Sequence, residues 1–141
     1  MKDSLRVLIV EDEALLQMQL EIYVEEAGHA VAGCASSLRD ALDLIRRERA
    51  DLALVDVHLA DGPTGVDVGR AFAEAGIGVV FLTANAKRIP SDFCGAIGVI
   101  DATTAAYPGF HEEIAITGTR GTLALRGGTL LAQFHDGTEE R

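Results

Sequence analysis

The chain has 141 residues, 48% of them hydrophobic, and this length and composition predict a single domain with a substantial core. Its formal net charge is −10, from 22 acidic and 12 basic residues, which excludes an electrostatic attraction to nucleic acid or to anionic membranes. From this charge we expect no nucleic-acid partner. No apolar stretch approaches the ~20 residues of a membrane-spanning helix, so we also expect no membrane association.

The first part of the chain alternates predicted strands with predicted helices. Strands are predicted at 5–10, 30–34, 52–56 and 78–83, and helices at 13–27, 37–49 and about 64–75. Gly28 ends the first helix, while Ser37 with Asp40 and Thr64 with Asp67 have the spacing of residues that cap the other two. This order predicts an α/β fold, with a parallel sheet and helices on both of its faces.

The alternation weakens after Thr83. Pro90 leaves room only for a short helix at about 91–95, and Ile97–Ile100 has the composition of a fifth strand. The composition then changes at Asp101, because seven of the nine threonines and six of the fifteen glycines lie in residues 102–141. We therefore expect the core of the domain to end at about residue 101.

Residues 102–141 have no helical periodicity. Short β-prone runs are separated by glycine-rich turns, and they are Ile114–Ile116, Thr122–Leu125 and Thr129–Phe134. The pattern predicts either a small β hairpin or meander or a poorly ordered tail, and the last residues, 136–141, form a polar terminus. The predicted organisation is thus a core at 1–101 and an atypical C-terminal segment at 102–141.

Three of the predicted strands end on residues that could carry phosphate chemistry. Strand 5–10 is followed by Glu11 and Asp12, strand 52–56 ends on Asp56, and strand 78–83 ends on Thr83. Ligands of open parallel sheets bind beyond the carboxyl ends of the strands. The sequence therefore predicts three carboxylates and a hydroxyl at one edge. Such carboxylates could bind a cation, and one of them could act as a nucleophile.

At this spacing the motifs resemble a known family. The segments Val-Glu11-Asp12-Glu, Leu-Val-Asp56-Val-His-Leu-Ala-Asp-Gly and Phe-Leu-Thr83-Ala-Asn are similar to those of the receiver domain (CheY-like) of bacterial two-component response regulators. The resemblance covers roughly residues 4–101. It implies a doubly wound five-stranded parallel sheet of order 2-1-3-4-5. An atypical β-prone segment would then replace the last helix of the family.

The resemblance also implies roles for individual residues. Asp56 would accept a phosphoryl group from the histidine of a partner kinase or phosphotransfer protein. Glu11, Asp12, Asp56 and the backbone carbonyl of His58 would hold Mg²⁺, which offsets the repulsion between the phosphoryl group and the carboxylates. Thr83 would contact the bound phosphoryl group and act as the switch. A domain of this kind is not an enzyme, since it takes part only in its own phosphorylation and dephosphorylation.

Each of these residues also has a purely structural interpretation. Acidic residues after a strand often cap the next helix, so Glu11 and Asp12 could act there with Glu13. Asp56 could be a turn residue, and Thr83 could be structural. The side chain of His58 is interpreted as an exposed loop residue, and its position beside the phosphoryl group in the family would let it influence attack by water.

The chain departs from the family at the end of the fifth strand. Ala102-Thr103 stands where receivers have a Lys-Pro pair, and the chain contains only Lys2 and Lys87. Lys87 lies four residues after Thr83, and it is either a substitute cation or an ordinary solvated lysine. Without the lysine, the crowded carboxylates should depend more strongly on a metal.

The function that we expect is that of a stand-alone receiver that acts through protein contacts. The atypical segment could expose strand edges, which predicts a homodimer formed through it. The alternative is a pseudo-receiver, a binding or dimerisation module without a phosphorylation switch. An aspartate-nucleophile phosphatase fits poorly, because Glu11 would occupy the place of its nucleophile.

The cysteines and the N-terminus indicate a reducing compartment. Cys34 and Cys94 are too few for a disulfide framework, and both lie in apolar contexts, which predicts reduced core residues. Residues 1–10 are charged and then strand-like, unlike a secretory leader. We therefore expect a cytoplasmic location.

Overall fold

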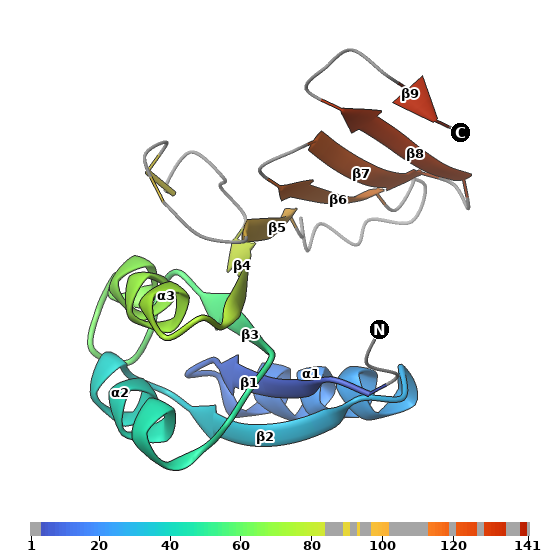
Figure 1. Ribbon diagram of the computed structural model, residues 1–141. Coiled ribbons are helices and arrows are strands. Elements are labelled where there is room, and N and C mark those ends of the chain that lie inside the picture. Colours follow the sequence, from blue (N-terminus) through green and yellow to red (C-terminus); the bar gives the residue numbers. More distant parts are fainter. Residues whose placement is uncertain are drawn as a thin grey trace.

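The computed structural model of the protein describes residues 4–83, 89, 90 and 93, and the backbone of five further strands between residues 97 and 140. Strands and helices alternate in its first part (Figure 1). They are β1 (Arg6–Val10), α1 (Ala14–Glu26), β2 (Ala30–Ala35), α2 (Leu38–Arg47), β3 (Leu52–Asp56), α3 (Gly65–Glu74) and β4 (Gly78–Thr83). None of the helices in these described residues is long and apolar enough to cross a membrane.

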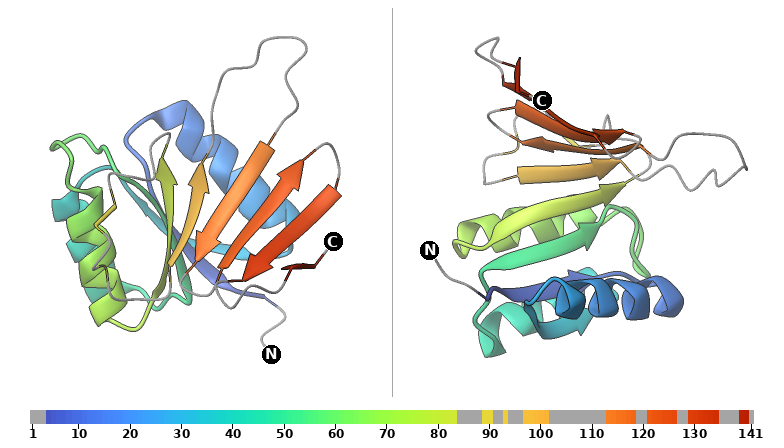
Figure 2. Two further views of the ribbon diagram at one scale, coloured as in Figure 1. Left: turned by 90° about the horizontal axis from the view of Figure 1, so that it is seen from above. Right: turned by 90° about the vertical axis from the view of Figure 1, so that its right-hand side faces the viewer.

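The first four strands form a parallel sheet in the order β2-β1-β3-β4, which confirms the predicted doubly wound α/β fold. Helix α1 lies on one face, and α2 and α3 lie on the other (Figure 2). Strands β1 and β3 are paired from Val7 with Leu52 to Val10 with Val55. This register brings the carboxyl ends of the two central strands to the same edge of the sheet.

The main core lies between the sheet and the helices α2 and α3. Phe72 of α3 and Phe81 of β4 are fully buried there, and the ring of Phe93 meets that of Phe81 edge-on, with centroids 5.2 Å apart. Gly69 of α3 lies against the same phenyl ring, since an added Cβ would be 2.4 Å from Cζ of Phe81. The close approach of α3 to β4 therefore depends on the absence of a side chain at position 69.

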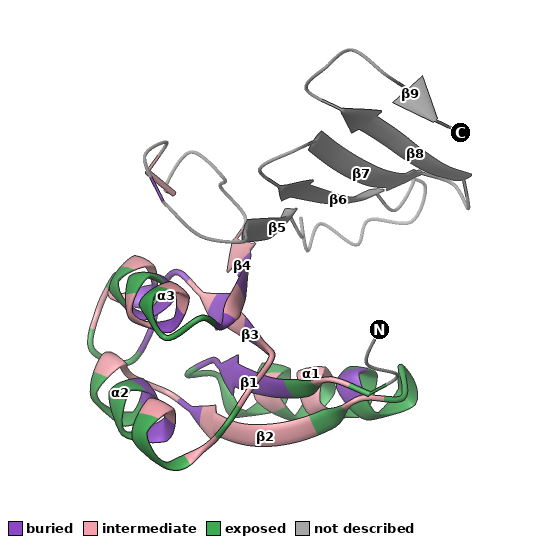
Figure 3. Ribbon diagram, in the orientation of Figure 1, coloured by how far each residue is buried: buried purple, intermediate pink, exposed green. Residues whose placement is uncertain are grey.

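Helix α1 is covered far less than the other two helices. Of its residues only Val24 is buried, in a small cluster with Val7 and Ile9 of β1 (Figure 3). Large apolar side chains of α1 are exposed to solvent, and they are Leu15, Leu16, Met18, Ile22 and Tyr23. The two faces of the described sheet are therefore unequally packed.

The two predicted helix caps have different outcomes. Ser37 Oγ accepts a hydrogen bond from the backbone N–H of Asp40 at 3.2 Å, so the cap of α2 is confirmed. The predicted cap by Thr64 is wrong, because its side chain makes no cap bond to α3 and its backbone is helical (φ −93°, ψ −1°). The hydroxyl of Thr64 instead donates to Asp61 Oδ1 at 2.6 Å.

Cys34 of β2 is a free, half-buried thiol. Its Sγ donates to Glu21 Oε1 at 3.0 Å, and burial together with this carboxylate raises the pKa of the thiol to about 12. Cys34 is therefore a protonated packing residue, as expected, with little thiolate character. Cys94 lies outside the described residues.

The backbone of the C-terminal part contains β5 (Ile97–Asp101), β6 (Glu113–Gly118), β7 (Gly121–Arg126), β8 (Thr129–Phe134) and β9 (Glu139–Glu140). Strand β5 pairs in parallel with β4, and each later strand pairs antiparallel with the one before it. Of the short helix expected at about 91–95, only residue 93 is among the described residues. Residues 102–112 all lie outside them.

We predict that Gly69→Ala lowers the free energy of unfolding by about 1–3 kcal/mol, because the new methyl group overpacks the core against Phe81. Helix propensity alone would favour alanine by roughly 1 kcal/mol, so a gain in stability would contradict this packing. Urea unfolding measures the effect. The double variant Gly69→Ala/Phe81→Leu should lose less than the sum of the two single variants, since the smaller side chain makes room.

Candidate functional site

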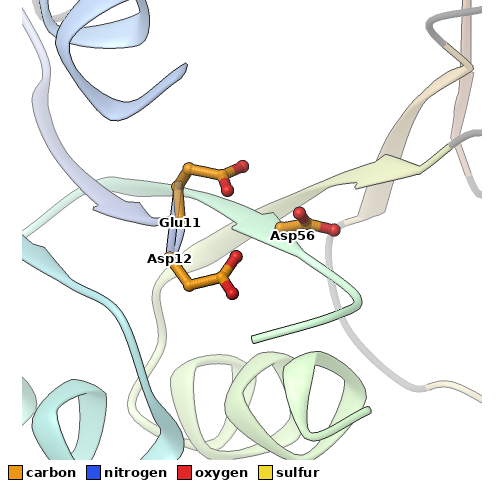
Figure 4. A group of neighbouring side chains, drawn as sticks. All are labelled: Glu11, Asp12 and Asp56. Carbon is orange, nitrogen blue, oxygen red and sulfur yellow. The ribbon is translucent and has the colours of Figure 1, made fainter. Parts of the chain in front are cut away.

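The carboxyl ends of β1 and β3 bring three acidic side chains together. Glu11 and Asp12 directly follow β1, and Asp56 is the last residue of β3. Each offers one carboxylate oxygen, and these oxygens lie within 4.8 Å of one another (Figure 4). The structure therefore confirms that the acidic residues gather at one edge. We call Glu11, Asp12 and Asp56 the carboxylate cluster.

The members of the carboxylate cluster differ in burial. Asp12 is exposed and Asp56 is half-buried, whereas Glu11 is only 3% exposed. The backbone N–H of Glu11 donates to the carbonyl of Ala35 at 2.9 Å, which continues the pairing of β1 with β2 by one residue. This bond holds the backbone of Glu11 at the edge of the sheet.

Burial and crowding raise the pKa of Glu11 to about 7 from its ordinary value of 4.5. Burial is the largest cause, and the neighbouring carboxyl groups of Asp56 and Asp12 add to it. The N–H of Glu13 opposes the shift by donating to Glu11 Oε1 at 2.9 Å. Full ionisation of the cluster is therefore costly, and a bound cation would offset that cost.

The carboxylate cluster fits a hard divalent cation. Its donor atoms are all carboxylate oxygens, which are the ligands that Mg²⁺ takes in proteins, usually one or two carboxylates with several waters. The exposed position of Asp12 leaves the edge of the site open to solvent. The residues present therefore suit Mg²⁺, in agreement with the expectation from the sequence.

His58 follows Asp56 by two residues, and Thr83 ends the neighbouring strand β4. His58 is exposed, and its backbone N–H donates to Asp56 Oδ1 at 3.1 Å. Thr83 is the half-buried last residue of β4, one position beyond Leu82, which is the register partner of Asp56. Both therefore lie at the expected edge, while their roles toward a phosphoryl group stay predictions. Lys87 lies outside the described residues.

Capping of α1 accounts for little of the arrangement around Glu11. Helix α1 has no acidic residue in its first turn, and the side chain of Glu13 makes no cap bond. The carboxylate of Glu11 accepts only the N–H of Glu13 among the backbone groups that begin this helix in the described chain. Capping is thus a minor part of what Glu11 does, whereas Asp56 combines its place in the cluster with a short turn to His58.

Gly65 contributes to the site although it has no side chain. A Cβ at this position would lie 2.0 Å from the carbonyl oxygen of Asp56 and 2.5 Å from Cα of Val57. The first turn of α3 therefore packs directly on the backbone that carries the central carboxylate. The signal was present as a cluster of turn-forming residues between Asp61 and Gly65.

Comparisons with known proteins agree with this arrangement. Residues 7–101 match the family described as the response regulator receiver domain. Chemotaxis protein CheY of Thermotoga maritima is 32% identical over 109 residues, which cover 74% of this chain and 82% of CheY. The regulator PhyR of Methylorubrum extorquens is 39% identical over 84 residues, or 58% of this chain, and the match spans only 32% of PhyR.

A solved structure shows the same likeness. The solution structure of the PhyR response regulator REC domain from Erythrobacter litoralis has a TM-score of 0.59 at 38% identity. The match covers 63% of this chain and 70% of that one.

We predict that, without Mg²⁺, the free energy of unfolding falls as the pH rises from about 4.5 to about 7. The sign follows because folded Glu11 keeps a proton that the unfolded chain has already released, so this contribution is fully present at low pH. The loss should be at most about 3 kcal/mol. Urea unfolding followed by circular dichroism across this range measures it.

Glu11→Gln is the matched control for this prediction, because it keeps the shape of the side chain and removes the titration. Its unfolding free energy should change less with pH than that of the wild type. Adding Mg²⁺ at pH 7 should stabilise the wild type more than the variant, since Glu11 is a charged ligand only in the wild type. Parallel pH curves for the two proteins would contradict the prediction.

Proposed function

The chain belongs to the response regulator receiver domain family, and from this we propose that Asp56 accepts a phosphoryl group. Receiver domains are signalling modules of two-component systems, not catalytic enzymes. The observation that supports Asp56 is its place in the carboxylate cluster, at the end of a central strand. The chain spans about a third of PhyR, so a role for the whole protein is part of the proposal.

The proposed reaction transfers a phosphoryl group from a phosphohistidine of a partner. A carboxylate oxygen of Asp56 forms a bond to phosphorus while the bond from phosphorus to the imidazole nitrogen breaks. The electron pair of that bond stays on the imidazole, and Asp56 becomes an acyl phosphate. The N–H of His58, which donates to Asp56 Oδ1, orients the carboxylate for attack by its other oxygen.

Receiver domains bind Mg²⁺, and the carboxylate cluster is present here. We propose that Glu11, Asp12, Asp56 and the backbone carbonyl of His58 hold the ion. When bound, Mg²⁺ supplies positive charge that offsets the repulsion between the phosphoryl oxygens and the carboxylates. Glu11 must then release its proton, and its raised pKa makes cation binding weaker as the pH falls.

Thr83 is the residue proposed to sense the phosphoryl group. Its hydroxyl would donate to a phosphoryl oxygen from the end of β4, on the same edge as Asp56. The receiver fold implies a kinase as the phosphodonor, and we propose a histidine kinase or a phosphotransfer protein. The signal would then pass through protein–protein contacts.

The C-terminal segment is a second part of the proposal. We propose a receiver core at residues 1–101 with the order 2-1-3-4-5, followed by a β-prone segment at 102–141 in place of the last helix. Such a segment offers strand edges that pair readily, so a homodimer through it is proposed. The alternative function is a pseudo-receiver that binds partners or dimerises without switching, and Ala102-Thr103 in place of Lys-Pro favours it.

The first prediction from this proposal concerns phosphorylation itself. Incubation with acetyl phosphate and Mg²⁺ should add one phosphoryl group, and intact-mass spectrometry detects it. Asp56→Asn should abolish the gain, because an amide oxygen is a poor nucleophile, and removal of Mg²⁺ by a chelator should do the same. An unchanged mass in every sample would overturn the proposal, and modification of Asp56→Asn would place the acceptor elsewhere.

The second prediction separates a switching receiver from the pseudo-receiver. Beryllofluoride with Mg²⁺ mimics a phosphoryl group, and hydrogen exchange should then slow around Asp56 and at the end of β4 if Thr83 closes on it. Thr83→Ala should remove the effect at β4 and leave that at Asp56. Protection limited to Asp56 in the wild type would favour the pseudo-receiver.

The proposed homodimer is tested by light scattering of the same samples over a dilution series. A monomer at every concentration would overturn it.

A further inference from the structure

The loop that follows Asp56 is bonded to the beginning of α2. The carboxylate of Asp61 accepts the backbone N–H of Leu38, with distances of 3.0 Å to Oδ2 and 3.3 Å to Oδ1. Next to it, the N–H of Ala60 donates to the carbonyl of Ser36 at 3.0 Å. We call residues 57–64 the Asp56 loop. Its Asp61 bonds to Leu38, 23 residues earlier in the sequence, and so joins the loop to the first turn of α2.

The Asp56 loop is also tied to itself. Thr64 Oγ1 donates to Asp61 Oδ1 at 2.6 Å, and Leu59 and Gly62 exchange two backbone hydrogen bonds of 2.9 Å. The side chains of Val57 and Leu59 are buried, whereas His58 between them is exposed. The backbone groups of His58 thus belong to a turn whose two ends are held in place.

We propose that Asp61 is a positioning residue for the phosphoryl-accepting site, because it fixes the Asp56 loop to the N-terminus of α2. This inference rests on the proposed function, in which the backbone carbonyl of His58 contacts the cation. Without the bond from Asp61, the Asp56 loop would remain connected to Asp56 only through the chain and would be less firmly placed beside it. The carbonyl and N–H of His58 would then no longer be preorganised beside that carboxylate.

The chemistry of Asp61 suits this role. The hydroxyl of Thr64 is the main cause that lowers the pKa of Asp61, and the N–H groups at the beginning of α2 lower it further. Asp61 is therefore ionised at neutral pH, and a carboxylate is a strong acceptor at the positive end of a helix dipole. The hydroxyl of Thr64 and the N–H of Leu38 thus both donate to the carboxylate of Asp61.

Asp61 does more than cap α2. The helix already has its own N-cap, since Ser37 Oγ accepts the N–H of Asp40. Asp61 adds a second acceptor that comes from a distant segment, so its hydrogen bond joins two parts of the chain. Loss of Ser37 would weaken one helix, whereas loss of Asp61 would remove the side-chain hydrogen bond that joins this helix to the Asp56 loop.

The experiment compares Asp61→Ala with Asp40→Ala, which removes a carboxylate from the first turn of the same helix without touching the Asp56 loop. The rate of phosphorylation by acetyl phosphate is measured against the Mg²⁺ concentration, and hydrogen exchange is followed in residues 57–64. Asp61→Ala should raise the half-saturating Mg²⁺ concentration about tenfold and speed exchange in the loop. Asp40→Ala should change neither by more than about twofold, because its effect stays within α2.

Asp61→Asn serves as the conservative variant and guards against a folding defect in Asp61→Ala. Its amide oxygen still accepts the N–H of Leu38, so it should recover part of the Mg²⁺ response. An unchanged half-saturating concentration in Asp61→Ala, or an equal rise in Asp40→Ala, would overturn the positioning role. If the wild type takes up no phosphoryl group, the proposed function fails. In that case hydrogen exchange alone tests whether Asp61 holds the Asp56 loop to α2. Unchanged exchange in residues 57–64 of Asp61→Ala would show that it does not.

Discussion

Repulsion among three carboxylates is the constraint on which the rest of this site depends. Oxygens of Glu11, Asp12 and Asp56 lie within 4.8 Å of one another, and Asp12 is the exposed member of the cluster. Such an arrangement is unfavourable for folding, and it persists because strong backbone pairing fixes both chain segments. Glu11 is locked to Ala35 across the sheet, and Asp56 ends a strand whose neighbours β1 and β4 pair with it on both sides. The core of the fold thus supplies the free energy that the cluster costs.

The two faces of the described sheet are packed to different degrees. The face covered by α2 and α3 contains the largest buried side chains, and Phe81 reaches from β4 toward α3 through the space left by Gly69. The strands that carry Asp56 and Thr83 are held by this face. The opposite face has only α1, whose apolar side chains stay largely in solvent in the described chain.

Much of this could be predicted from the sequence, where local pattern decides. Strands 52–56 and 78–83 have the predicted bounds because each is an apolar run between clear breaks. The cap by Ser37 was predictable because it spans three residues. Thr64 has the same local signal, but its hydroxyl bonds to Asp61, so a contact within the loop wins over the helix. The burial of Glu11 and the tie from Asp61 to Leu38 depend on tertiary structure, which no short motif contains.

Gly65 contributes to the phosphoryl-accepting site through backbone packing alone. It has no side chain to bind, donate or attack, and yet the backbone of Asp56 lies where its Cβ would be. The property that matters at this position is empty space, which allows α3 to begin against the acceptor strand. A survey of polar and titratable groups would pass over it. Any exchange of this domain's loops with those of another receiver therefore has to carry the glycine along with the acidic residues, or the transplanted aspartate will be pushed from its place.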